Sequence, residues 1–230
     1  MHFNPAAPTL DHLVVMAASL SEGVAWCEAT LGVTPGPGGE HPLMGTHNRL
    51  LKIATPGFPT AYLEIIAINP VAAPPTPTRA RRWFDMDDPA LRARIALQGP
   101  TLVHAVVSVP DIRAAVAALG AQGLDRGEVL QAARPTAHGL LQWHITVRAD
   151  GQRLFDGCLP TLIQWGPAHP TDHMPASGVT LHSLRVQHPQ ADTLRAACLG
   201  MGWTAQAVAA GAPRLSAILQ TPKGLIEITT

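Results

Sequence analysis

Three weak copies of one unit follow each other along this sequence, and this repetition limits the fold more than any other feature. Each copy opens with a short β-branched run of strand character, at residues 9–15, 101–107 and 180–186. A stretch with helical spacing follows each run. The closing glycines stand at nearly equal distances from the three opening strands: Gly32, Gly123 and Gly202. The copies therefore represent one structural module used three times.

Each helical stretch is followed by candidate strands with turn residues between them. We expect strands at 48–54, 61–68, 128–132, 140–148, 159–165, 215–220 and 225–229. The pairs Pro56-Gly57 and Asp150-Gly151 are typical of tight connections between antiparallel strands. Each unit thus has one strand, one helix and about three further strands, with one sheet face covered by the helix. The predicted fold class is α+β, with repeated βαβββ modules that form a curved sheet cup.

The domain organisation follows from these repeats. We place the modules at 1–70, 101–168 and, in a shorter form, 178–230, with a Pro-rich linker and a short helix at 71–100. The stretch Pro70 to Pro77 is expected to be an extended connector. In the short helix, Asp88 is the predicted N-cap and Pro89 the first helical residue. In the helices of the first two modules, Ser19 is the predicted cap and Pro110 is expected in the first turn.

The charge balance argues against polyanionic partners. The chain has 16 basic and 16 acidic residues, so it lacks the positive field that a nucleic acid or an anionic membrane would need. No basic stretch followed by a long apolar run stands at the amino terminus, and we expect a cytoplasmic protein. The three cysteines, Cys27, Cys158 and Cys198, lack paired spacing and are interpreted as buried thiols in a reducing compartment.

The alternation of side chains along a strand brings two polar groups of the first module to one face. On the opening strand, His12 lies on one face, and Asp11 and Leu13 are expected on the other. On the last strand of the module, Glu64 lies opposite Leu63. If the apolar residues cover the helix, His12 and Glu64 both point into the free, concave face.

The same logic applies to the second module. His104 falls opposite Val103 and Ala105, and Gln164 falls opposite Ile163. Four polar side chains are therefore expected at matching places in two repeated sheets.

Five segments carry a resemblance to a known family. They are residues 10–14 (LDHLV), 45–48 (GTHN), 62–66 (YLEII), 87–91 (DDPAL) and 162–165 (LIQW). These segments resemble the glyoxalase-like domain family of the vicinal-oxygen-chelate superfamily, which includes glyoxalases, bleomycin-resistance proteins and extradiol dioxygenases. The resemblance covers roughly the first three quarters of the chain, and the last module is similar only through the repeat.

The resemblance implies a metal site. In metal-dependent relatives, a His or Gln on the first strand and a Glu on the last strand of each of two modules bind one divalent ion. Carried over, this pattern names His12, Glu64, His104 and Gln164 as ligands of Zn, Ni, Co, Mn or Fe. Gln164 departs from the Glu that is common in relatives, which makes the site less anionic. The third module has Ser183 at the histidine place, and we expect no second metal there.

Other residues are candidates for substrate binding. His47 and Asn48, in the middle segment of the resemblance, and Tyr62, which shares the face of Glu64, are expected to contact the substrate. The alternative for His47 and Asn48 is hydrogen bonding within a hairpin. Trp143 and His144 are adjacent on a strand, so at most one of them reaches the cup.

The spacing of His169 and His173 suits a helix face, but Pro170 interrupts that helix and leaves only a weak candidate for a second zinc site.

Two functions remain open at this point. The first is a metal-dependent lyase or isomerase, in which the ion stabilises an enolate of a small oxygen-bearing substrate and Glu64 is both ligand and catalytic proton carrier. The alternative is a metal-free protein of the bleomycin-resistance type, which binds and sequesters a small hydrophobic or aromatic molecule. In the metal-free case His12, His104 and Glu64 are satisfied by hydrogen bonds that line a binding cup. Because two modules close one cup, the third module either pairs with its mate in a homodimer or packs on the first two.

Overall fold

The computed structural model describes residues 7–72, 81–204 and 207–230, and it contains the βαβββ unit three times. The first module consists of β1 (Thr9–Met16), α1 (Leu20–Leu31), β2 (Glu40–His41), β3 (Thr46–Lys52) and β4 (Tyr62–Ile68). After α2 (Pro89–Gln98), the second consists of β5 (Thr101–Ser108), α3 (Ile112–Gly120), β6 (Glu128–Thr136), β7 (Gly139–Val147) and β8 (Thr161–Trp165). The third consists of β9 (Thr180–Gln187), α4 (Ala191–Gly200), β10 (Val208–Ala209), β11 (Arg214–Thr221) and β12 (Gly224–Thr229). The predicted α+β architecture of repeated modules is confirmed.

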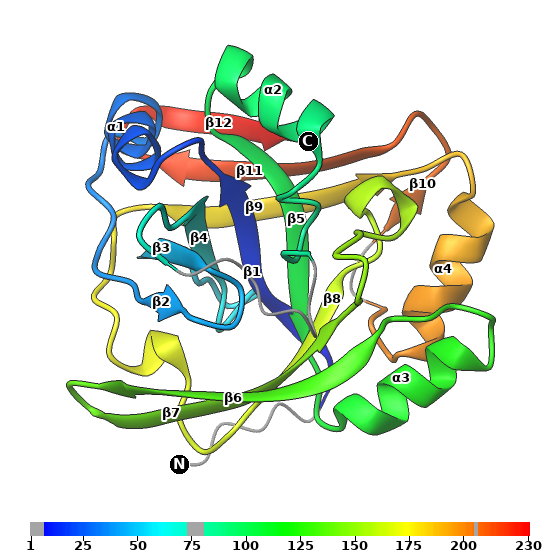
Figure 1. The fold of residues 1–230 in the computed structure, drawn as a ribbon. Helices are drawn as coiled ribbons and strands as arrows, with labels where there is room; N and C mark the ends of the chain where they lie inside the picture. Colours follow the sequence, from blue (N-terminus) through cyan, green and yellow to red (C-terminus); the bar gives the residue numbers. More distant parts are fainter. Residues whose placement is uncertain (1–6, 73–80, 205–206) are drawn as a thin grey trace.

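The first two modules share one strongly curled sheet of eight strands in the order β2-β3-β4-β1-β5-β8-β7-β6. The opening strands β1 and β5 pair antiparallel at its centre, and each pairs parallel with the last strand of its own module. In Figure 1 the long β6–β7 hairpin sweeps below β1 and β5, so that the sheet curls into a cup. The two modules are thus related by an approximate twofold axis between β1 and β5.

Each face of the curled sheet has its own apolar core. On the face covered by helices, Cys27 and Leu31 of α1 pack with Leu63 and Ile65 of β4. Gly23, Cys27 and Leu31 are four residues apart, which places all three on one side of α1. On the concave face, a smaller cluster includes Ile66 of β4 and residues of the segment that precedes α2. The sheet is therefore buried on both sides.

The third module packs against the first pair within the same chain. Its four strands form a second sheet in the order β10-β9-β11-β12. The backbone N–H of Leu181 donates to the carbonyl of Ile53 at 2.8 Å, and its apolar residues join the helix-side core of the first sheet. The third module thus packs on the first two modules of its own chain, which is one of the two predicted arrangements. Homodimerisation stays a prediction.

Helix starts follow the predicted capping chemistry except at α3. The Ser19 hydroxyl accepts a hydrogen bond from the N–H of Glu22 (3.2 Å), and the Asp88 carboxylate accepts one from Leu91 (2.7 Å). The prediction that Pro110 lies in the first turn of a helix is wrong. The helix begins after Asp111, whose carboxylate accepts hydrogen bonds from the first turn. None of the helices in the described ranges is long and apolar enough to cross a bilayer.

The Pro-rich connector lies mostly outside the described residues, which omit 73–80.

The cysteines are free and buried, as predicted. Burial raises the pKa of the Cys27 and Cys198 thiols to about 12 and that of Cys158 to about 11. Because only the thiolate is nucleophilic, these residues behave as ordinary core side chains.

Close packing of α1 on β4 depends on Gly23. A Cβ atom at this position would overlap Ile65 Cγ2 and lie 3.2 Å from the Ala17 Cβ. We expect Gly23→Ala to lower the free energy of unfolding by about 1 kcal/mol, because overpacking outweighs the gain in helix propensity. The control is Gly120→Ala in α3, where nothing lies within 4 Å and Ala should stabilise by about 0.5–1 kcal/mol. Urea denaturation measures both, and stabilisation by both variants would contradict the packing argument.

Candidate functional site

Two strands of the first module place His12 and Glu64 side by side in a cavity on the concave face. β1 and β4 run parallel, and Val14 of β1 is opposite Glu64. The two side chains are almost fully buried, and the distance from His12 Nε2 to Glu64 Oε2 is 3.6 Å. This gap is too long for a direct hydrogen bond. Both atoms line the cavity, where a ligand can reach them.

A β-bulge in β1 places a further carboxylate, that of Asp11, behind His12. Leu10 pairs with Val107 and His12 with Val106, so Asp11 is an extra residue with no partner on β5. The prediction that Asp11 lies on the opposite face from His12 is wrong, because the bulge interrupts the alternation of side chains. The Asp11 Oδ1 atom accepts a hydrogen bond from His12 Nδ1 at 2.7 Å.

Asp11 is fully buried and holds three ring N–H groups together. Its Oδ2 atom accepts hydrogen bonds from Trp165 Nε1 (2.7 Å) and His169 Nε2 (3.0 Å). Burial by itself raises the pKa of Asp11. Interactions with His169 and His12 lower this pKa by a larger amount and hold it well below its usual range. The carboxylate is therefore ionised and fixes the tautomer of His12, with the proton on Nδ1 and Nε2 directed at Glu64.

His169 is held in turn by the segment that follows β8. It is the N-cap of a short 3-10 helix at Pro170–Asp172, and its backbone N–H donates to Asp172. His169 Nδ1 accepts a hydrogen bond from the Thr171 N–H (3.2 Å), which leaves Nε2 to donate to Asp11. Thus a residue that the sequence offered only as part of a weak zinc candidate supports the centre of the site.

Glu64 is oriented by Asn48 on β3 and lies near His41 on β2. The Asn48 side-chain amide donates to Glu64 Oε1 at 2.6 Å, while the Asn48 carbonyl oxygen accepts from the Gly39 N–H at 2.7 Å. His41 Nε2 lies 4.0 Å from Glu64 Oε1. Burial lowers the pKa of His41 to about 4, although the charge of Glu64 acts in the opposite direction. His41 is therefore neutral near pH 7, and Oε2 is the carboxylate oxygen left for a ligand.

The three residues expected to bind substrate separate into two groups. Asn48 and Tyr62 line the cavity, and the Tyr62 ring stacks on His12 with 4.6 Å between centroids. Burial, Asp11 and Glu64 raise the pKa of Tyr62 well above its ordinary value. His47 alternates away from Asn48 on β3 and is not among the residues that line this cavity.

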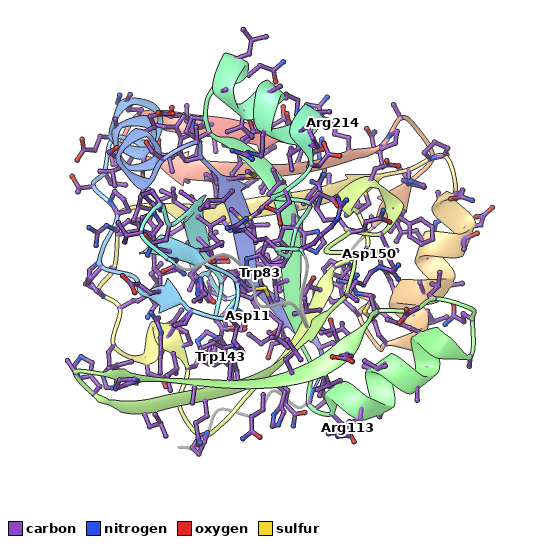
Figure 2. All side chains as sticks on the ribbon, viewed as in Figure 1. Asp11, Trp83, Arg113, Trp143, Asp150 and Arg214 are labelled. Atoms are coloured by element: carbon purple, nitrogen blue, oxygen red, sulfur yellow. The ribbon has the colours of Figure 1, made fainter. Side chains whose placement is uncertain are left out.

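Aromatic rings form most of the remaining wall. Trp83, Phe84, Trp143 and Trp165 line the cavity together with Tyr62. Figure 2 labels Trp83 and Trp143, which line the cavity, and Asp11 near them, in the region of β1 and the β6–β7 hairpin. Trp143 reaches the cavity and its neighbour His144 does not, as expected from alternation on a strand. The inner cavity has a volume of about 40 Å³, room for about three water-sized groups.

His104 is engaged elsewhere in the core. Its Nδ1 lies 2.9 Å from the carbonyl of Gly157, and its Nε2 accepts the N–H of Thr161 at 3.1 Å. Burial, with the nearby charges of Arg126 and Arg153, lowers the pKa of His104 well below its ordinary value. Both ring nitrogens of this neutral imidazole are therefore used by the protein itself.

Gln164 also lies away from His12 and Glu64. On β8, Ile163 belongs to the concave-side cluster and Trp165 lines the cavity, so Gln164 faces the helices. Its amide oxygen accepts the N–H of Ile112 at the start of α3 (3.0 Å). The expected alternation is thus reversed on this strand, because Ile163 and Trp165 fill the cup instead of covering the helix.

The hydrogen bonds of His104 and Gln164 decide whether these residues can bind the divalent ion that the resemblance implies. A metal ligand must offer a free lone pair to the ion, and His104 Nε2 and Gln164 Oε1 already accept backbone N–H groups. In the described part of the chain, the four residues that the resemblance names do not converge. The donor set therefore does not fit the ion in the way that the resemblance implies.

The comparisons with known proteins agree with this fold. The glyoxalase-like domain family matches residues 10–201. This chain belongs to the glyoxalase-like domain family. The match includes both modules of the cup and places the chain in the vicinal-oxygen-chelate superfamily. No curated protein matches the sequence.

Solved structures are similar to this chain at low sequence identity. A hypothetical protein from Staphylococcus aureus is 14% identical, with a TM-score of 0.57 over 96% of this chain and 85% of that chain. Methylmalonyl-CoA epimerase from Streptomyces coelicolor is 15% identical, with a TM-score of 0.42 over 71% of this chain and 96% of that one. The epimerase from Mycobacterium tuberculosis is 18% identical, with a TM-score of 0.39 over 72% and 92%.

Sequence reasoning on this glyoxalase-like protein missed Asp11, His41 and His169. Asp11 was assigned to the wrong face because nothing in the sequence marks the bulge. His169 follows the last strand of the second module, and its contact with Asp11 spans most of the chain. The one available signal was the excess of histidines, 11 in a chain with a single tyrosine.

Replacing Asp11 tests whether its carboxylate holds the site together. We expect Asp11→Asn to lower the free energy of unfolding by about 3 kcal/mol, because the amide would direct a donor at groups that already donate. Urea denaturation near pH 7 measures this change. Asp192→Asn is the control, since Asp192 is exposed and pairs only with Arg195, and it should change stability by less than ~1 kcal/mol.

The pH dependence gives a second check on Asp11. Its pKa is lower in the folded protein, so its contribution is present above the unfolded pKa of about 3.9 and is lost as pH falls below it. The difference in stability between the unsubstituted protein and Asp11→Asn should shrink below about pH 4. A constant difference down to acid pH would contradict an ionised Asp11.

Proposed function

We propose that this glyoxalase-like protein catalyses proton transfer, as an isomerase or lyase, on a small oxygen-bearing substrate bound between its first two modules. One observation carries the proposal. Glu64 Oε2 and His12 Nε2 face each other across 3.6 Å in the cavity, while Asn48 and Asp11 hold the opposite ends of the two groups.

Glu64 is the proposed general base. Asn48 binds Oε1 and leaves Oε2 directed into the cavity. A positioned carboxylate can remove a proton from a carbon next to a carbonyl group, and such general-base assistance contributes typically about 10²–10⁴-fold to a rate. Apolar and aromatic walls keep bulk water from competing for this oxygen.

His12 is the proposed second proton carrier. Its Nδ1–H is held by Asp11, so Nε2 carries the lone pair that faces the cavity. When Nε2 takes up a proton, the ionised Asp11 stabilises the imidazolium that forms. In the isomerisation of a hydroxy ketone, Glu64 takes a proton from one substrate carbon and returns it to the neighbouring carbon. His12 Nε2 takes the hydroxyl proton and returns it to the former carbonyl oxygen, so both side chains end in their starting protonation states and the substrate is neither oxidised nor reduced overall.

The proposal assigns no step to a divalent ion. Proton removal, proton return and orientation are all supplied by side chains of this chain.

Solvent exchange tests the proposal directly. Phenylpyruvate, phenylacetone and hydroxyacetone have protons next to a carbonyl, and their replacement by deuterium in D₂O can be followed by proton NMR. We expect faster exchange than in buffer for at least one compound, and a loss of about 10²-fold or more with Glu64→Gln. Exchange at the buffer rate for all three compounds would contradict the proposal.

The matched control for this assay is Glu227→Gln. Glu227 occupies the corresponding strand of the third module and lies outside the cavity, with a half-exposed ion pair to Arg214. The Glu227→Gln variant should exchange substrate protons at the same rate as the unsubstituted protein. His12→Gln should also reduce the rate of deuterium exchange. Tyr62, which stacks on His12, should stay in the cavity wall of this variant.

A second candidate function is sequestration of an aromatic compound, favoured by Trp83 and Trp143, which line both the inner cavity and the larger outer hollow. Stacking on such rings binds flat apolar molecules without any chemical step. This function predicts a rise in melting temperature with aromatic ligands that Glu64→Gln preserves and Trp143→Ala reduces. Binding without any proton exchange would favour sequestration over catalysis.

A further inference from the structure

Arg134, on β6, is the one arginine in the lining of the cavity that contains His12 and Glu64, and it forms no ion pair with a carboxylate in the described ranges. Five other arginines form ion pairs with Asp or Glu side chains: Arg82, Arg148, Arg153, Arg195 and Arg214. Arg134 is half-buried, and no such pair involves it within residues 7–72, 81–204 and 207–230. A partly buried cation without a partner is unusual, since desolvation of its charge is uncompensated.

The position of Arg134 connects three hollows on the concave side. It lines the inner cavity that contains His12 and Glu64, and it lines two outer hollows of about 340 Å³ and 540 Å³. In the described part of the chain it is the one residue common to all three linings. A group bound to Arg134 therefore belongs to a ligand that can also reach Glu64.

The surroundings of Arg134 leave room for its guanidinium. Carboxylates line the inner cavity (Glu64) and the larger outer hollow (Glu40), and none lines the smaller outer hollow. The guanidinium lies against Gly39, where any side chain would overlap the Arg134 Nη1 atom. The hollow of about 340 Å³ is lined by Arg134, His138 and His173, with no Asp or Glu in its lining. The two histidine rings stack at 3.9 Å between centroids. This hollow thus offers the Arg134 guanidinium to an anion without a carboxylate that would compete for it.

The size of the inner cavity requires a ligand that extends outward. About 40 Å³ accommodates the reacting atoms beside Glu64 but no aromatic or branched body. The rest of the ligand must lie in the outer hollows, past Arg134. The larger outer hollow has an apolar lining that includes Met44, Leu130 and Trp143, and it suits an apolar body.

We infer that the substrate is an organic oxyanion with an apolar or aromatic body, whose carboxylate or phosphate group binds Arg134. The planar guanidinium binds such groups through two parallel hydrogen bonds. This inference rests on the proposed function, because it defines the substrate class of the same cavity. It adds a specificity-determining residue that lies on the second module, opposite the proton-transfer pair on the first.

Calorimetric titration of the full chain tests the inference with phenylpyruvate and its methyl ester, which differ in the negative charge. We expect the acid to bind at least about tenfold more tightly than the ester, and the preference to weaken as salt rises. Phenyl phosphate in a second arm shows whether phosphate or carboxylate is the better anion. Absence of binding by both anions to the unsubstituted protein overturns the inference.

Variants assign the preference to Arg134. In Arg134→Gln the acid and the ester should bind equally, and Arg134→Lys should keep part of the preference because it keeps the charge. Arg113→Gln is the matched control: Arg113 is an exposed arginine on α3 (Figure 2) that lines none of the three hollows, and its loss should leave the preference unchanged. An unchanged preference in Arg134→Gln overturns the inference.

A further variant separates this inference from the proposed function. Glu64→Gln should lose deuterium exchange and keep the preference for the anion. If the unsubstituted protein prefers the acid but exchanges no proton, the proton-transfer function fails and the anion site stands.

Discussion

A buried, ionised Asp11 is the interaction on which the site depends. It accepts hydrogen bonds from His12 on its own strand and from Trp165 and His169 at the end of the second module. An ionised carboxylate inside a protein is stable only when such donors compensate its lost hydration. The bonds to Trp165 and His169 therefore join the first module to the end of the second, and the bond to His12 fixes the proton of that ring on Nδ1.

The two halves of the cup contribute different things to the cavity. The first module supplies the polar centre, His12, Asn48 and Glu64, while the second supplies Trp143 and Trp165 as walls and Arg134 at the junction of the hollows. The matching position on β5 is filled by His104, which is used for hydrogen bonds inside the core. The duplicated modules have thus diverged, so that one supplies the polar centre of the cavity and the other shapes the space around it.

Much of the fold could be predicted from the sequence because local rules act on each repeat separately. Strand alternation placed Glu64 correctly beside Tyr62, and capping residues such as Ser19 and Asp88 marked helix starts. These rules failed where a distant contact decided the outcome. The bulge at Asp11 becomes stable through bonds to Trp165 and His169, and Gln164 turns away because its neighbours on β8 fill the cup.

The sequence by itself determined the module, its threefold repetition and the presence of His12 and Glu64 on the inner face. These follow from periodicity and residue type, which act over a few residues at a time. Only the tertiary structure decided which polar groups meet: Asp11 with His169, His104 with Thr161, and Arg134 with no carboxylate in the described residues. The physical reason is that burial and hydrogen-bond competition between remote segments are settled only when the sheet curls and the modules pack.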